Sequence, residues 1–184
     1  MQAYIGMFTT HHTLLGGDGN GFKAGGYGSN GSSIPNPVPR HVVKFCLAVK
    51  NRANGFNANH HTGGLDWINN TAINNSANYN MFCTLASDND TDVSGYDQYM
   101  KNNLGYLGRA QVVKLGPAGD NDVTYNFWTL PVSVTAADFT SLNELLLTQS
   151  RQANGSLPEI DYARLNSGSD LIDQGRFYIA RIIF

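Results

Sequence analysis

The stretch FCLAVKN at residues 45–51 decides the fold, because a related stretch, NNTAINN, follows at residues 69–75. Superimposed, the two segments place Ala48 on Ala72 and Asn51 on Asn75, so the repeat has a period in the low twenties. Short strands that repeat with such a period and are joined by tight turns are typical of a β-solenoid, in which each repeat forms one rung of a stack. The repeat therefore predicts an all-β parallel β-helix.

Two further copies extend the repeat in both directions. The segment NNLGY at 102–106 matches NNTAI at 69–73 with a longer spacing, and the excess is a polar insertion at 87–98. The segment NGF at 20–22 recurs at 54–56, and here the excess is a Gly/Ser/Pro-rich stretch at 27–39. Loops that grow outward at the corners of a solenoid leave its stack intact, so four rungs are predicted.

Asparagine is expected to hold these rungs together. Its side chain tolerates left-handed turns and can bond laterally to the next rung, so the match of Asn51 with Asn75 predicts a ladder. A simple preference of asparagine for turns is the alternative interpretation.

The repeat fades after about Val123, where one last strand is expected. We predict β-helix rungs in residues 1–134 and a C-terminal helix and tail in residues 135–184, with a short helix at 136–147. Because a bare terminal rung would be an aggregation-prone edge, this tail is expected to cap the stack.

The composition excludes several classes of function. The formal net charge is −2 and only 14% of the 184 residues are charged, so no broad basic field attracts nucleic acid. No run is apolar enough to span a membrane, and no signal peptide is visible at the start of the sequence. Two cysteines, Cys46 and Cys83, are read as buried thiols. An acidic polymer could bind only through local cations or bridging metal ions.

The segment GNGFKAGG at 19–26 is the most unusual local signal, because one lysine lies among glycines that let a large substrate approach the backbone. The register of the repeat places Lys23 beside Asn57. Residues two apart on a strand share a face, so Gly25 and Asn59 are expected on that same face. A solvated surface lysine is the alternative interpretation of Lys23.

A lysine close to other cations loses its proton more readily and can then act as a base. Arg40, Lys44, Lys50 and Arg52 are the candidate cationic neighbours and also candidate partners for sugar carboxylates. They could equally be ordinary solubilising charges.

Two histidine pairs, at 11–12 and 60–61, suggest metal binding, but adjacent residues on a strand point in opposite directions. No metal ligand is therefore predicted among them. His60 or His61 is instead expected to contact sugar at the edge of the candidate face. Carboxylates at 88–97 could form a hydrolase pair, although a solvated loop is the simpler interpretation.

Together, GDGNGFKAGG at 17–26, NRANGF at 51–56 and NNTA at 69–72 resemble family 9 polysaccharide lyases, which are pectate lyases with a right-handed parallel β-helix. The resemblance reaches the segments GSLP at 155–158 and GSDLID at 168–173. It implies cleavage of the acidic polysaccharide polygalacturonate by β-elimination. It also implies that the base is the lysine of the NGFK motif, here Lys23.

The family resemblance implies calcium as well, held by aspartates on rungs that precede this lysine. In the sequence before Lys23 only Asp18 is acidic, so the calcium ligands are expected to be absent and the chain to be a truncated form. The resemblance implies a secreted, periplasmic or cell-surface location for a full-length relative.

The sequence thus predicts the C-terminal portion of a pectate lyase, with Lys23 as the base. Its predicted substrate contacts are Arg52, Asn57, Asn59 and His60. A non-catalytic β-helical module that binds or adheres to acidic glycans is the alternative.

Overall fold

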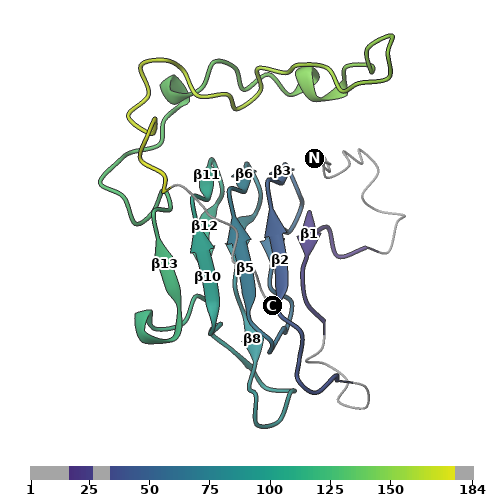
Figure 1. Ribbon diagram of the computed structural model, residues 1–184, viewed down its shortest axis with the longest axis vertical. Helices are drawn as coiled ribbons and strands as arrows, with labels where there is room; N and C mark the ends of the chain where they lie inside the picture. The colour runs from purple at the N-terminus through teal and green to yellow at the C-terminus, as the bar shows by residue number, and fades with distance from the viewer. Residues whose placement is uncertain (1–16, 27–33, 177–184) are drawn as a thin grey trace.

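The computed structural model describes residues 17–26 and 34–176, and these residues form a stack of parallel strands (Figure 1). Three parallel sheets make up its sides. Sheet A consists of β3 (Leu47–Val49), β6 (Thr71–Ile73) and β11 (Leu104–Tyr106). Sheet B consists of β1 (Phe22–Lys23), β4 (Asn54–Asn57), β7 (Ala77–Asn80) and β12 (Ala110–Val113). Sheet C consists of β2 (His41–Lys44), β5 (Leu65–Ile68), β10 (Gln98–Lys101) and β13 (Asp122–Thr124).

Along the chain the strands visit sheets C, A and B in turn, so that β2-β3-β4, β5-β6-β7 and β10-β11-β12 are complete rungs. Within the described residues, β1 adds part of a rung before them and β13 part of a rung after them. In Figure 1, β13, β10, β5 and β2 lie side by side across the stack. The predicted parallel β-helix is confirmed.

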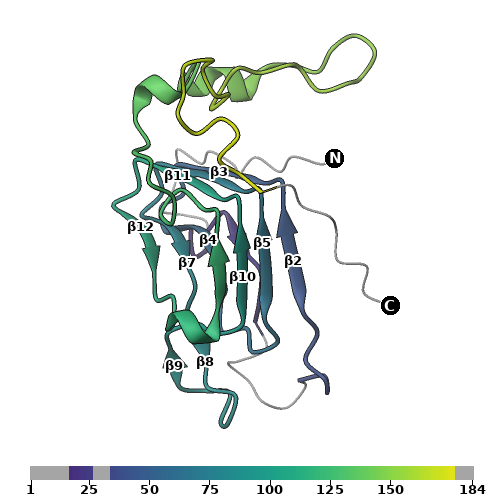
Figure 2. The ribbon, with the colours of Figure 1, turned by 60° about the vertical axis from the view of Figure 1, so that its left-hand side comes forward.

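The register between rungs agrees with each predicted superposition. Ala48 pairs with Ala72 and Gly105 with Ala72 in sheet A, while Phe22 pairs with Phe56 in sheet B. The polar insertion contains the antiparallel hairpin of β8 (Cys83–Thr84) and β9 (Asp92–Val93), which extends beyond the rungs (Figure 2). An insertion at a corner therefore leaves the stacking register unchanged, as a solenoid requires.

Asparagine ladders run through the stack at two corners. At the A-to-B corner, the amide group of Asn51 and its backbone N–H both donate to Asn75 Oδ1, at 2.8 and 2.9 Å, so the predicted ladder is confirmed. At the C-to-A corner, Asn70 donates to Asn103 at 3.1 Å and Asn103 to Asn126 at 2.8 Å. These amide groups satisfy buried backbone groups where the chain turns.

Left-handed residues make the corners themselves. At the C-to-A corner Asn69 and Asn102 have φ of 53° and 56°, and each immediately precedes an asparagine of the ladder. Turn preference and laddering therefore act on adjacent asparagines, and both interpretations of the asparagine pattern apply.

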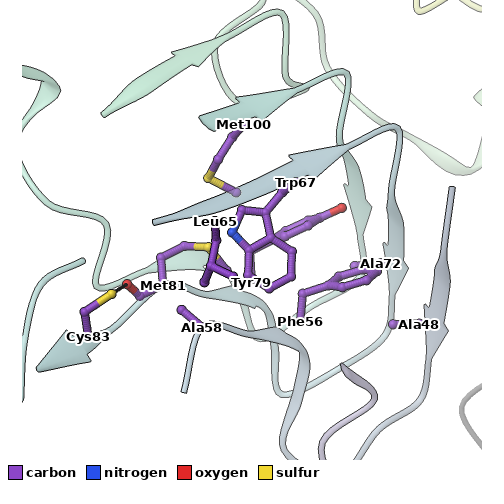
Figure 3. Close-up of a cluster of buried hydrophobic side chains, with 10 residues drawn as sticks. All are labelled: Ala48, Phe56, Ala58, Leu65, Trp67, Ala72, Tyr79, Met81, Cys83 and Met100. Atoms are coloured by element: carbon purple, nitrogen blue, oxygen red, sulfur yellow. Dashed lines mark hydrogen bonds between the residues drawn. The ribbon is translucent and has the colours of Figure 1, made fainter. Parts of the chain in front are cut away.

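Aromatic side chains fill the interior in a stack that follows the rungs (Figure 3). The rings of Phe22 and Phe56 lie 5.0 Å apart and nearly parallel, and Phe56 and Tyr79 lie 5.2 Å apart in the same way. Trp67 Nε1 donates to Gln98 Oε1 at 2.8 Å, so its polar atom is satisfied inside the core. Offset aromatic pairs of this kind each contribute about 1 kcal/mol beyond area burial.

The segment after β13 differs from the expected single strand and short helix. The strand ends at Thr124, and the region from residue 136 to 148 contains two short 3₁₀ helices, η3 (Ala136–Asp138) and η4 (Glu144–Thr148). A third, η2 (Ala118–Asp120), precedes β13. A capping box between Thr135 and Asp138 accounts for the start of η3, and no helical repeat of apolar residues prolongs it.

The tail contacts the side of the stack. Leu147 and Tyr162 pack against Val49 of β3 and Ile73 of β6, and this second apolar cluster crosses the rungs of sheet A. Figure 1 shows the tail running across the ends of β3, β6 and β11. The tail therefore covers a lateral face that spans several rungs. The division of the chain at residue 134 stays a prediction.

Candidate functional site

Lys23 projects from the outer face of sheet B. Its neighbour Phe22 stacks on Phe56 in the core, and successive strand residues point to opposite faces, so Lys23 faces outward. Its Cα partner is Asn57, as the repeat predicted, and 40% of its side chain is exposed. Sheet B thus presents this amine at the described end of the stack.

Two charged residues surround the amine. Lys23 Nζ forms an ion pair with the Asp18 carboxylate, which is itself exposed. The hydrogen bond and charge of Lys23 lower the pKa of Asp18 below its ordinary value, and the nearby guanidinium of Arg52 lowers it further. Arg52 also donates to the carbonyl oxygen of Gly17 at 3.2 Å. Lys23, Asp18 and Arg52 therefore form one charged cluster.

The other predicted cations lie elsewhere. Arg40 bonds with Asp66 at 2.6 Å and with Asp97 at 3.0 Å beside sheet C. Lys50 forms an ion pair with Glu144 of the tail, and Lys44 ends β2 in sheet C. Of the four candidates, the structure brings Arg52 alone into the cluster around Lys23.

Asn57 and Asn59 shape the backbone next to the lysine. Asn57 is only 4% exposed, and its Oδ1 accepts a hydrogen bond from the Asn59 N–H at 2.9 Å. Asn59 and His60 follow in the left-handed region, with φ of 50° and 64°. Two consecutive non-glycine residues in this region are uncommon, and they turn the side chain of His60 away from the strand direction.

His60 is held by residues that the sequence interpretation missed. Its Nδ1 lies 2.6 Å from Asp92 Oδ1, and its ring meets the ring of Phe82 edge to face at 4.6 Å. Asp92 belongs to β9 in the insertion, where the sequence favours a solvated loop. The repeat could not predict this contact, because the insertion lies outside the periodic register.

The side chains of His60 and His61 diverge, but the two residues follow β4 in a turn, so the left-handed backbone separates them and not the strand alternation that was expected. His61 is fully buried, its Nε2 lies 2.9 Å from Pro39 O, and its ring stacks on His41 at 4.2 Å. His60 instead faces Asp92. Burial lowers the pKa of His61, and the neighbouring His41 lowers it further. The pair at 11–12 lies outside the described residues.

Gly21 and Gly25 serve the packing of the stack, which corrects the expectation that these two glycines admit substrate. A Cβ at Gly25 would lie 2.2 Å from Ala58 O and 2.4 Å from His61 Cβ. A Cβ at Gly21 would lie 2.7 Å from Gly55 O. Side chains at these positions would push β1 off the next rung, because the clashing atoms include the backbone of that rung.

The described donors next to Lys23 do not fit a calcium ion. Calcium takes six to eight oxygen ligands, usually from several carboxylates. In residues 17–26 and 34–176, no three His, Cys, Asp or Glu side chains come together in a way that could hold a metal. Asp18, the carboxylate in contact with Lys23, already has that amine as its partner. None of the helices in this part of the chain is long and apolar enough to cross a membrane.

Curated proteins are similar to this chain in sequence. The chain is 34% identical over 159 residues to pectate lyase L of Dickeya chrysanthemi, covering 86% of this chain and 32% of that protein. It is 33% identical over 163 residues to pectate lyase L of Dickeya dadantii (strain 3937), covering 89% and 33%. The chain therefore spans about a third of the length of these curated relatives.

Two solved structures are similar as well. A rhamnogalacturonan lyase superimposes with a TM-score of 0.75 at 39% identity, covering 82% of this chain and 37% of that one. The crystal structure of pectate lyase Pel9A gives a TM-score of 0.68 at 30% identity, covering 93% and 38%. The family model described as "Pel9A-like, right handed beta helix region" matches residues 3–103, more than half of the chain. The chain belongs to this Pel9A-like family of right-handed β-helices.

Proposed function

We propose that this chain is part of a polysaccharide lyase that cleaves polygalacturonate by β-elimination, with Lys23 as the base. The observation that carries the proposal is the placement of Lys23 on the outer face of sheet B, in register with Asn57. A neutral amine there removes the C5 proton beside the sugar carboxylate. The electron pair forms the C4–C5 double bond, and the glycosidic oxygen leaves from C4.

The names of the relatives support this chemistry and this class of substrate. Pectate lyases and a rhamnogalacturonan lyase share 30–39% identity with the chain. Pectate and rhamnogalacturonan are therefore the two substrates to compare. Such polymers lie outside cells, so we also propose a secreted, periplasmic or cell-surface location.

The charged cluster of Lys23, Asp18 and Arg52 contributes the base and a cation to the β-elimination step. A lysine that accepts a proton must first be neutral, so Lys23 has to release its own proton to solvent and separate from Asp18 before the step. Arg52 lies beside Asp18 and offers a guanidinium for the sugar carboxylate. His60 and Asn59 lie on the next rung, where a neighbouring sugar would contact them. Calcium would neutralise the sugar carboxylate, but the described donors do not fit it and no step is derived through it.

A non-catalytic module that binds acidic glycans is the second candidate. The charged cluster favours it, because Lys23 and Arg52 are cations that can pair with sugar carboxylates without any proton transfer. This candidate predicts affinity for polygalacturonate without a new double bond, and affinity that survives Lys23→Ala.

The test incubates the chain with polygalacturonate and with rhamnogalacturonan, each with and without calcium, and follows the ultraviolet absorbance of the unsaturated product. Loss of a general base should lower the rate about 100- to 10,000-fold, so Lys23→Gln should abolish turnover. Lys44→Gln, an exposed lysine of sheet C, is the matched control and should retain it. Equal rates for Lys23→Gln and the unaltered chain would refute the assignment of the base, and binding without product would favour the module.

A further inference from the structure

Beyond Lys23, the outer face of sheet B continues across three more strands. Asn57 of β4 pairs with Asn80 of β7, and Asn80 pairs with Val113 of β12. Figure 2 shows β4, β7 and β12 as neighbouring strands on this side of the stack. The residues that follow these strand ends are therefore neighbours in space, although they come from different rungs.

A row of three side chains follows these strand ends: His60 after β4, Phe82 after β7 and Lys114 after β12. The His60 ring lies 4.6 Å from the Phe82 ring, edge to face. Lys114 Nζ lies over the Phe82 ring, 4.8 Å from its centroid. Lys114 has a φ of 55°, which turns it out of the strand direction. The aromatic ring therefore holds the ammonium group at a defined place.

Both ends of this face carry cationic side chains, and the positions between them are uncharged. Lys114 is exposed, and no carboxylate of the described part of the chain forms an ion pair with it. The nearby carboxylate of Asp92 is bonded to His60. At the other end lie Lys23 and Arg52. Between them, β4 and β7 hold Asn57, which is buried, and Asn80, which is partly buried, and neither is charged.

We propose that Lys114, positioned by Phe82, is a second carboxylate-binding subsite for an acidic polysaccharide that extends along the stack from Lys23. This inference rests on the proposed function, because that function supplies the acidic polysaccharide as the ligand. From β1 to β12 there are three strand spacings, roughly 14 Å in total. Digalacturonate is shorter than this span once one of its sugars is seated at Lys23, whereas polygalacturonate reaches both ends. Lys114 therefore adds affinity only for long chains.

The experiment measures binding in a Lys23→Gln background, where cleavage is suppressed and equilibrium is reached. Adding Lys114→Gln should weaken binding of polygalacturonate by up to about fivefold, as expected for an exposed ion pair. Binding of digalacturonate should stay unchanged. Phe82→Leu should weaken binding of the polymer in the same direction, because the ammonium loses its fixed place. Lys44→Gln on sheet C is the matched control and should leave both affinities unchanged.

The outcomes separate this subsite from the lyase chemistry. If the unaltered chain forms product and Lys114→Gln leaves the affinity for polygalacturonate unchanged, the subsite is overturned and the lyase is kept. Absence of product together with polymer binding that depends on Lys114 overturns the lyase and keeps the subsite. Equal weakening of the short and the long ligand by Lys114→Gln, or no binding of polygalacturonate at all, overturns the subsite.

Discussion

Replacing Asn103 by alanine should destabilise the stack more than replacing an asparagine whose side chain makes only one hydrogen bond. The Asn103 side chain makes four hydrogen bonds inside the corner. Its Oδ1 accepts from the backbone N–H and the amide group of Asn70, at 3.2 and 3.1 Å. Its Nδ2 donates to Trp67 O and Asn126 Oδ1, both at 2.8 Å. Asn103 is almost completely buried, so water cannot replace these partners.

The expected magnitude follows from this count. A net contribution of about 1 kcal/mol per hydrogen bond gives a loss of about 4 kcal/mol for Asn103→Ala. Asn51 is the matched control, because within the described residues its side chain makes one hydrogen bond, to Asn75 at 2.8 Å. Asn51→Ala should therefore cost about 1 kcal/mol.

Urea unfolding followed by tryptophan fluorescence measures both losses, because Trp67 is fully buried and its indole is bonded to Gln98. The midpoint should fall further for Asn103→Ala at a similar slope, which reports the surface exposed on unfolding. Equal losses in the two variants would refute the view that the ladder amides satisfy the corners.

Three further predictions concern packing, pH and thiol reactivity. Gly25→Ala should destabilise β1 by about 1–3 kcal/mol, because the new Cβ meets the backbone of the next rung. Gly119→Ala is the control and should leave stability unchanged, because the space around Gly119 is open. Hydrogen exchange in β1 and thermal unfolding measure the two effects. Burial lowers the pKa of His61 from its ordinary 6.5, so the unfolded chain binds more protons than the folded chain as pH falls through 6.5. Urea unfolding should therefore show a free energy of unfolding that falls towards pH 5. If His61→Gln showed the same dependence of this free energy on pH, the prediction would be wrong. Burial raises the pKa of Cys83 to about 11 and also raises that of Cys46, so a thiol reagent at pH 8 should label Cys83 more slowly than Cys46 until urea unfolds the chain.

The repeat predicted the fold because stacked parallel strands place equivalent residues directly above one another. The offset that superimposes Ala48 on Ala72 is the register of sheet A, and the shared NGF segments give the register of β1 with β4. The same periodicity could not predict the tail. Its apolar residues, such as Leu147 and Tyr162, pack against a lateral face, and that contact leaves no periodic signal in the sequence.

The candidate site was only partly predictable for the same reason. The register predicted Lys23 beside Asn57, whereas His60 and His61 were expected on a strand and lie in a left-handed turn after β4. It did not predict Asp92 as the partner of His60, because the hairpin that carries Asp92 is an insertion. The roles of Arg52, Asn57, Asn59 and His60 towards substrate remain predictions.

The amino-acid sequence alone determined that this chain winds into a β-helix and that Lys23 faces outward from it. A periodic sequence is sufficient for this, because the repeat sets backbone register and register sets which face each side chain takes. Only the tertiary structure decided which charges meet: Asp18 with Lys23, Asp92 with His60, and Lys114 over Phe82. Those contacts depend on corners and insertions, whose conformations follow from local packing between rungs and leave no period in the sequence.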